Sequence, residues 1–154
     1  MTSIADKFAD IKILFFDLDG VLIQNGQLDS LCEHLKEFCD KMNSIEMQTV
    51  IITAREEDET TKLLQSNGEC KVISASVNKV KAAAEVLLNN NLNFDQAFYI
   101  GDDILDIPLL QRVRLKACPS TARREVKRNV DFIVSGNTAK EIFNEIEKQI
   151  MGLE

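Results

Sequence analysis

The sequence lacks any long apolar run, and it has few residues of the types that build zinc sites. No stretch of the 154 residues approaches the roughly 18 apolar residues of a membrane-spanning helix, and residues 1–10 lack the apolar core of a signal peptide. The four cysteines, Cys32, Cys39, Cys70 and Cys118, have no zinc-type spacing, so we expect reduced, partly buried thiols in a cytoplasmic protein. The single histidine, His34, falls in a predicted helix and is expected to be exposed and without a partner.

The sequence also lacks an excess of basic residues. It contains 18 Lys and Arg against 25 Asp and Glu, which gives a net charge of −7 and argues against nucleic acid or an anionic membrane as a partner. The basic run at residues 123–128 is interrupted by an acid and is typical of a solvated helix face. The negative net charge does not argue against a small phosphorylated substrate, because a bound metal ion can make the electrostatic potential of a site positive.

Short apolar segments alternate with amphipathic segments throughout, with no repeat, linker or low-complexity tract. This alternation predicts an α/β fold, a Rossmann-like three-layer sandwich with a mostly parallel sheet of about five to six strands flanked by helices. The length fits a single domain over residues 1–154, and the loops are too short for a cap domain. The predicted strands lie at 11–16, 49–52, 71–73, 96–100, 115–118 and, at the sheet edge, 132–134. The predicted helices begin near residue 29 and cover 57–66, 78–88, 104–112, a short basic segment and 138–150, with a polar turn at 24–27.

Polar side chains follow four of the predicted strands. Asp17 and Asp19 come after the first strand, residues 53–55 after the second, and residues 101–103 after the fourth, while Lys79 opens the helix after the third. Ligands of open parallel sheets bind beyond the carboxyl ends of the strands. We therefore expect these carboxylates, a hydroxyl and an ammonium to meet at one edge of the sheet.

The two acids after the first strand point to a metal ion. Asp17 and Asp19 lie on one face of an extended backbone, and Gly20 then lets the chain turn away. Two such charges a few ångströms apart repel by roughly 4 kcal/mol at an effective dielectric constant of about 20, which a hard cation such as Mg²⁺ offsets. A metal, a lysine and a threonine together suit a phosphoryl group, and a carboxylate beside them can attack phosphorus.

As an ordered set, these segments resemble the four motifs of the haloacid dehalogenase superfamily of phosphatases. Within it, the cap-less chain most resembles the 3-deoxy-D-manno-octulosonate 8-phosphate phosphatases and the related nonulosonate 9-phosphate phosphatases. The motif segments are residues 17–21, 52–53, Lys79 and residues 101–103 with Asp106. The resemblance implies a Mg²⁺-dependent phosphomonoesterase that acts on a small phosphorylated metabolite, most of all a sugar-acid phosphate, through an aspartyl-phosphate.

The resemblance also implies a role for each acid. Asp17 corresponds to the nucleophile and a Mg²⁺ ligand, and Asp19 to the general acid/base, with its backbone carbonyl on the metal. Asp102 corresponds to a further metal ligand, supported by Asp103 and Asp106.

The remaining implied roles concern phosphate, substrate and assembly. Thr53 and Lys79 would hold phosphoryl oxygens, with Lys81 as the rival lysine, and Arg55 would contact the substrate, whose recognition would also involve the loop 23–28. The resembling enzymes form tetramers through a β-hairpin after the first motif, and the segment after Val21 is too short for it. They also use an arginine in a glycine-rich C-terminal segment, whereas residues 135–140 contain one glycine and no arginine.

Each residue also has an ordinary structural interpretation. Asp-x-Asp-Gly occurs in solvated turns, a lone threonine after a strand caps helices, and paired acids favour a helix N-terminus. Two other functions share the residue types: a receiver domain phosphorylated on aspartate, and a non-catalytic binding protein with the same fold. A receiver places its acceptor aspartate between the acid pair and the threonine, an order that this chain does not have.

Overall fold

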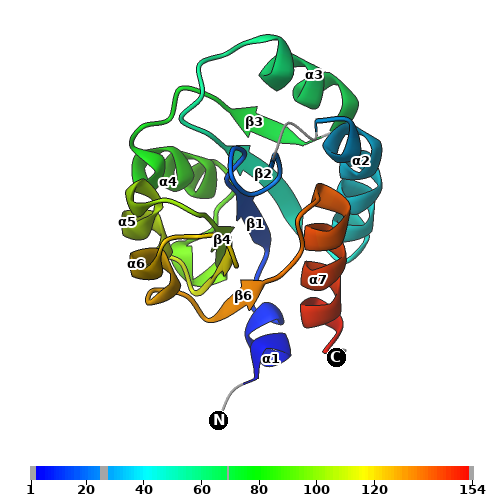
Figure 1. The fold of residues 1–154 in the computed structure, drawn as a ribbon. Helices are drawn as coiled ribbons and strands as arrows, with labels where there is room; N and C mark the ends of the chain where they lie inside the picture. The colour runs from blue at the N-terminus through cyan, green and yellow to red at the C-terminus, as the bar shows by residue number, and fades with distance from the viewer. Residues whose placement is uncertain (1–2, 25–27, 69, 153–154) are drawn as a thin grey trace.

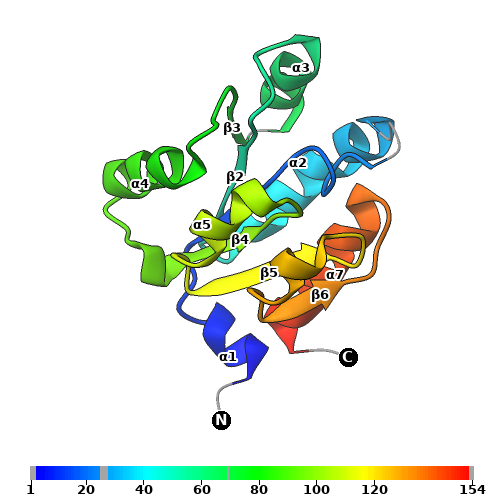
Figure 2. The same cartoon turned by 60° about the vertical axis from the view of Figure 1, so that its left-hand side comes forward.

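The computed structural model describes residues 3–24, 28–68 and 70–152, which form a six-stranded, fully parallel sheet with helices on both faces (Figures 1 and 2). The strand order is β3-β2-β1-β4-β5-β6, so β1 and β4 are neighbours at the centre and β3 and β6 form the edges. The strands are β1 (Ile13–Phe16), β2 (Gln48–Ile52), β3 (Lys71–Ile73), β4 (Ala97–Ile100), β5 (Leu115–Pro119) and β6 (Phe132–Val134). The predicted fold class is confirmed, and the sheet has the order of a doubly wound Rossmann-like fold.

Helices cover both faces of this sheet, and the apolar side chains of each strand alternate between two cores. The helices are α1 (Ile4–Phe8), α2 (Leu28–Ser44), α3 (Glu59–Gly68), α4 (Lys79–Asn89), α5 (Ile107–Leu110), α6 (Arg124–Lys127) and α7 (Ala139–Met151), with 3₁₀ turns η1 (Phe94–Gln96) and η2 (Ile104–Asp106). Leu14 and Phe16 of β1 pack with α1, α2 and α7, whereas Ile13 and Phe15 pack with α4, α5 and α6. Successive strand residues point to opposite faces, which is why an uninterrupted apolar run serves two cores.

The chain order reverses across the centre of the sheet, and this fixes where a ligand can bind. From β1 the chain proceeds outward through β2 and β3, then crosses back to β4 and continues to β5 and β6. The loops after β1 and β4 therefore diverge to opposite sides and leave a crevice between them. Asp17 and Gly101 are the first residues of those two loops.

The predicted elements are present with shifted ends, and two were missed. The sequence analysis did not predict α1 or η1, and the helix expected over 104–112 is instead a 3₁₀ turn followed by the short α5, which has Pro108 in its first turn. The loops at the carboxyl edge contain no inserted domain among the described residues, and no helix within the described ranges is long and apolar enough to cross a membrane. Of the polar turn expected at 24–27, residues 25–27 lie outside the described part of the chain.

Two expectations about single residue types can be compared with the structure. The four cysteines, which all lie in described segments, are thiols, with Cys32 partly buried and the other three buried. His34 differs from the expectation, because it is partly buried and its Nε2 lies 3.8 Å from a carboxylate oxygen of Glu33. The partner is the residue that precedes His34 in α2.

An aromatic cluster joins the central strand to α2 and α7. The rings of Phe38 and Phe143 are stacked, with centroids 4.3 Å apart, and Phe16 meets each of them edge-on at 5.7 Å. These side chains are at most 2% exposed, so the two longest helices dock on the sheet through this cluster.

Phe143→Ala is expected to lower the free energy of unfolding by about 3–5 kcal/mol, because it removes a ring from a fully packed cluster and leaves a cavity. Urea denaturation followed by circular dichroism measures this change. Leu88→Ala on the exposed side of α4 is the control and should change stability by less than about 0.5 kcal/mol. Equal effects of the two substitutions would show that the cluster does not anchor the helices.

Candidate active site

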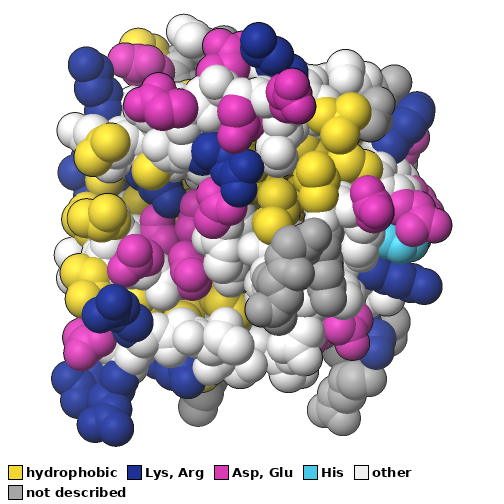
Figure 3. Space-filling view, turned by 45° about the horizontal axis from the view of Figure 1, so that its top comes forward, with side chains coloured by type: hydrophobic (Ala, Val, Ile, Leu, Met, Phe, Trp, Pro, Cys, Tyr) yellow, Lys and Arg dark blue, Asp and Glu magenta, His cyan; other side chains and the backbone are white. Residues whose placement is uncertain are grey.

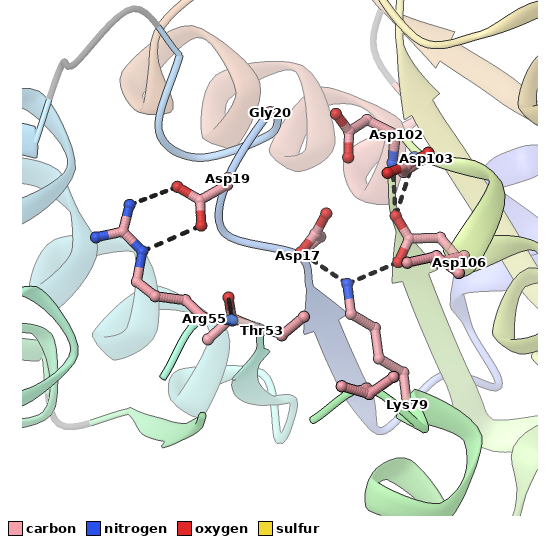
Figure 4. Close-up of a pocket in the computed structure, with 12 residues that line it drawn as sticks. Asp17, Asp19, Gly20, Thr53, Arg55, Lys79, Asp102, Asp103 and Asp106 are labelled. Carbon is pink, nitrogen blue, oxygen red and sulfur yellow. Dashed lines mark hydrogen bonds and ion pairs between the residues drawn. The ribbon is translucent and has the colours of Figure 1, made fainter. Parts of the chain in front are cut away.

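A pocket of about 330 Å³ opens at the carboxyl edge of the sheet, at the point where the strand order reverses (Figure 4). Acidic and basic side chains meet on this face of the molecule (Figure 3). The loops after β1, β2 and β4 and the start of α4 all contribute to the pocket. Its lining residues are Asp17, Asp19, Gly20, Thr53, Ala54, Arg55, Val77, Lys79, Asp102, Asp103, Leu105 and Asp106.

The floor of the pocket is a buried network around the ammonium of Lys79. Nζ donates hydrogen bonds to Oδ1 of Asp17 at 2.8 Å and to Oδ1 of Asp106 at 2.7 Å, and it lies 3.3 Å from the hydroxyl of Tyr99. The Tyr99 hydroxyl donates to the same oxygen of Asp106 at 2.7 Å. Lys79 and Asp17 are 7% and 6% exposed, so solvent screens the attraction within this pair less than in a pair at the surface.

Asp106 supports the site from below. Its Oδ2 accepts hydrogen bonds from the backbone N–H groups of Asp102 and Asp103 at 3.0 and 3.1 Å, so both of its oxygens are fully used. A side chain at Gly101 would place a Cβ 2.7 Å from the Asp106 side chain, so this close approach requires glycine. Asp106 therefore fixes the backbone that presents Asp102 and fixes Lys79 at the same time.

Burial and charge shift the pKa values of this network in opposite directions. Burial raises the pKa of Asp17 well above its usual range, and the negative charge of Asp106 adds to this rise, while the charge and hydrogen bond of Lys79 offset part of it. Burial likewise raises the pKa of Asp102. For Asp106 burial would raise the pKa, but the charge and hydrogen bond of Lys79, together with the hydrogen bonds from Tyr99 and the backbone N–H of Asp103, outweigh burial and lower it. Burial raises the pKa of Tyr99 well above its usual value, which keeps its hydroxyl neutral and able to donate.

Asp102 faces Asp17 across the pocket. One carboxylate oxygen from each of Asp17, Asp102 and Asp106 lies within 4.8 Å of the others, which is a separation that a cation can bridge. Gly20, with φ of +86°, lets the first loop pass so close that a Cβ there would overlap the Asp102 carboxylate. Since Asp106 already accepts from four donors, Asp17 and Asp102 are the two carboxylates with ligand capacity to spare.

The loop after β2 forms the opposite wall. The Thr53 side chain is buried and its Oγ1 accepts the backbone N–H of Arg55 at 3.0 Å. The guanidinium of Arg55 donates to both carboxylate oxygens of Asp19, at 3.1 and 2.6 Å, and to Asp58 at 3.2 Å. Figure 4 shows the Asp19 side chain directed toward Arg55 and away from Asp17.

The predicted residues thus converge on one pocket, with differences in detail. Lys79 and not its rival Lys81 enters the pocket, since Lys81 is exposed and only its backbone N–H bonds to Asn78. Asp103 lines the rim and caps η2 by accepting the N–H of Ile104. The sequence analysis missed Tyr99, whose place in a buried strand gave no signal beyond its being the only tyrosine of the chain.

The chain matches a known protein family over more than half of its length. The model for haloacid dehalogenase-like hydrolases covers residues 65–146, which contain Lys79, Asp102 and Asp106. Two curated relatives are named 3-deoxy-D-manno-octulosonate 8-phosphate phosphatase. The protein from Haemophilus influenzae is 25% identical over 154 residues, covering 94% of this chain and 85% of that protein. The protein from Salmonella typhi is 25% identical over 142 residues, covering 86% and 74%.

Solved structures share the fold across nearly the whole chain. A cobalt-bound Haemophilus influenzae phosphatase of the same name has a TM-score of 0.79 at 22% identity and covers 95% of this chain and 90% of its own. The Moraxella catarrhalis enzyme in complex with magnesium, phosphate and the sugar acid has a TM-score of 0.79 at 18% identity, covering 97% and 91%. The chain belongs to the haloacid dehalogenase-like hydrolase family.

Proposed function

We propose that this hydrolase is a Mg²⁺-dependent phosphomonoesterase that forms an aspartyl-phosphate on Asp17 and acts on a sugar-acid phosphate. The observation that carries the proposal is the position of Asp17 at the switch point of the sheet, with one oxygen held by buried Lys79 and Asp102 facing it. A carboxylate fixed on one oxygen presents the other to a substrate in a constant direction.

The residues present fit a divalent cation. Burial raises the pKa values of both Asp17, which is buried, and Asp102, which is half-buried, so the negative charge of these two acids is not fully balanced. Hard cations prefer such carboxylate oxygens, and Asp17 and Asp102 would hold the ion together with the backbone carbonyl of Asp19. When bound, Mg²⁺ would neutralise phosphoryl oxygens and keep both acids ionised.

The proposed reaction has two steps, and Asp17 and Asp19 would act in both. An oxygen of Asp17 attacks phosphorus and the ester P–O bond breaks, while Asp19 gives a proton to the departing alkoxide. Water then attacks the aspartyl-phosphate, Asp19 takes its proton, and phosphate leaves with Asp17 restored. The Thr53 hydroxyl and the Lys79 ammonium would hold the phosphoryl oxygens throughout.

The substrate class rests on the relatives and on one side chain of the pocket. The curated relatives are named for 3-deoxy-D-manno-octulosonate 8-phosphate, an ester that carries a carboxylate far from its phosphate. Arg55 lies at the pocket mouth with a guanidinium that pairs with carboxylates. A nonulosonate 9-phosphate would suit the same groups, and another phosphorylated metabolite is the alternative substrate.

A receiver domain is the competing function of a different class, and the topology disfavours it. Receivers have the flavodoxin-like strand order 2-1-3-4-5, whereas this sheet has the order 3-2-1-4-5-6. A phosphatase also turns over many times, while a receiver is phosphorylated once. Steady-state release of phosphate therefore separates the two, and separates the enzyme from a non-catalytic binding protein.

Asp17→Asn is expected to lower kcat for p-nitrophenyl phosphate with Mg²⁺ by about 10³-fold or more, because it removes the attacking carboxylate and keeps its shape. Release of p-nitrophenol measures the rate, and circular dichroism checks the fold. Asp95→Asn, an acid in η1 whose side chain does not line the pocket, is the matched control and should retain full activity. Retention of wild-type turnover by Asp17→Asn would disprove the nucleophile.

Mg²⁺ is expected to stabilise the protein and not only to activate it. At a concentration 100 times its Kd, an ion that binds only the native state adds about 2.7 kcal/mol to the free energy of unfolding. Thermal unfolding with and without Mg²⁺ measures this as a rise in Tm, and EDTA should abolish both the rise and the activity. Asp102→Asn should lose most of the rise, and an equal rise in that variant would place the ion elsewhere.

A further inference from the structure

The side chain that should act at the leaving oxygen is held away from it by Arg55. Both carboxylate oxygens of Asp19 accept hydrogen bonds from the guanidinium, Oδ1 from Nη2 at 2.6 Å and Oδ2 from Nε at 3.1 Å. A bidentate pair of this kind fixes direction as well as distance. In this arrangement Asp19 points to the loop after β2 and not to Asp17 (Figure 4).

Arg55 is a fixed anchor for this pair. Its backbone N–H donates to Thr53 Oγ1 at 3.0 Å, and its carbonyl accepts the N–H of Ala75 at 2.7 Å. Nη1 donates to Asp58 at 3.2 Å, and that carboxylate in turn accepts the backbone N–H of Thr61 at the start of α3. The guanidinium is thereby held at the pocket mouth whether or not Asp19 is bound to it.

The pair is nevertheless accessible and easily exchanged. The side chains of Arg55 and Asp19 are 30% and 51% exposed, and ion pairs this open to solvent add little net stability. Another carboxylate that reaches Arg55 can replace Asp19 with no change in the number of charges paired. The buried pairs of Lys79 do not have this freedom, because breaking them leaves an unpaired charge in the interior.

We propose that Arg55 exchanges the Asp19 carboxylate for the substrate's own carboxylate, and that this exchange releases Asp19 to turn toward the leaving oxygen beside Asp17. The inference rests on the proposed role of Asp19 and deepens it by coupling substrate recognition to the position of that side chain. A phosphate ester without a carboxylate leaves Asp19 bound to Arg55. Arg55 is thus a positioning residue that selects for phosphorylated acids.

The test compares two esters that differ only at the end remote from phosphate. Both 6-phosphogluconate and sorbitol 6-phosphate are open-chain six-carbon phosphates, and the first has a carboxylate where the second has a hydroxymethyl group. The variants are Arg55→Met, which keeps the apolar stem, and Arg123→Met, which removes another cation near the rim, 3.9 Å from Asp103. Turnover of p-nitrophenyl phosphate, which needs little protonation of its leaving group, reports separately on the proposed phosphatase function.

The exchange predicts opposite effects of Arg55→Met on the two esters. The wild-type enzyme should prefer 6-phosphogluconate over sorbitol 6-phosphate by about tenfold in kcat/KM. Arg55→Met should raise KM for 6-phosphogluconate, because the substrate carboxylate loses its partner. The same substitution should raise kcat for sorbitol 6-phosphate about two- to fivefold, because Asp19 is no longer held. Arg123→Met should preserve the wild-type preference.

A fall in the kcat of Arg55→Met on both esters would show that Arg55 supports Asp19, and would overturn the exchange. An unchanged kcat on sorbitol 6-phosphate would overturn it as well. An enzyme active on p-nitrophenyl phosphate but inert toward 6-phosphogluconate would also overturn it, whereas inactivity on p-nitrophenyl phosphate would reject the phosphatase function itself.

Discussion

The ammonium of Lys79 between the carboxylates of Asp17 and Asp106 is the interaction on which the rest of the site depends. Burial alone would lower the pKa of Lys79, but the two carboxylates and their hydrogen bonds outweigh it and raise the pKa, so the group stays charged. A cation placed in the interior without such partners would cost several kcal/mol. The other features of the floor follow from this need: Asp106 is positioned by two backbone N–H groups, Tyr99 donates to the same carboxylate, and Gly101 leaves room for it.

The network balances the charge of Asp106 but leaves the charges of Asp17 and Asp102 only partly compensated. One ammonium serves two carboxylates, and Asp102 lies beside them with no cation of its own among the described contacts. The result is a raised pKa at Asp17 and Asp102 and a lowered one at Asp106, although all three acids share one corner of the sheet. That division fits the function proposed above, in which Asp106 supports the site and Asp17 and Asp102 would meet a cation and a phosphoryl group.

Much of the fold and most of the site residues were predictable from the sequence, because they depend on periodicity and chain order. Short apolar runs predict the strands, and the rule that ligands bind beyond their carboxyl ends places Asp17, Thr53, Lys79 and Asp102 at one edge of the sheet. The α1 helix was missed although Ser3 and Asp6 form a capping box, since one turn of helix carries little periodicity. The side-chain hydrogen bonds within the pocket were not predictable. Nothing in the sequence spacing indicates that Arg55 contacts Asp19 or that Tyr99 contacts Asp106, because these contacts depend on the directions of side chains from separate segments.

The pocket therefore has two halves with different physical properties, and each suits a different task. The floor, with Asp17, Lys79 and Asp106, is buried and joined by short hydrogen bonds, so its geometry resists change and suits the holding of a phosphoryl group in one orientation. The wall, with Asp19 and Arg55, is open to solvent and paired by exchangeable contacts. In the proposed exchange, discrimination among substrates falls to this open wall, whose side chains respond to the remote end of the substrate. In this arrangement the rigid floor can keep the same phosphoryl chemistry, while changes in the wall alone adapt the pocket to a particular ester.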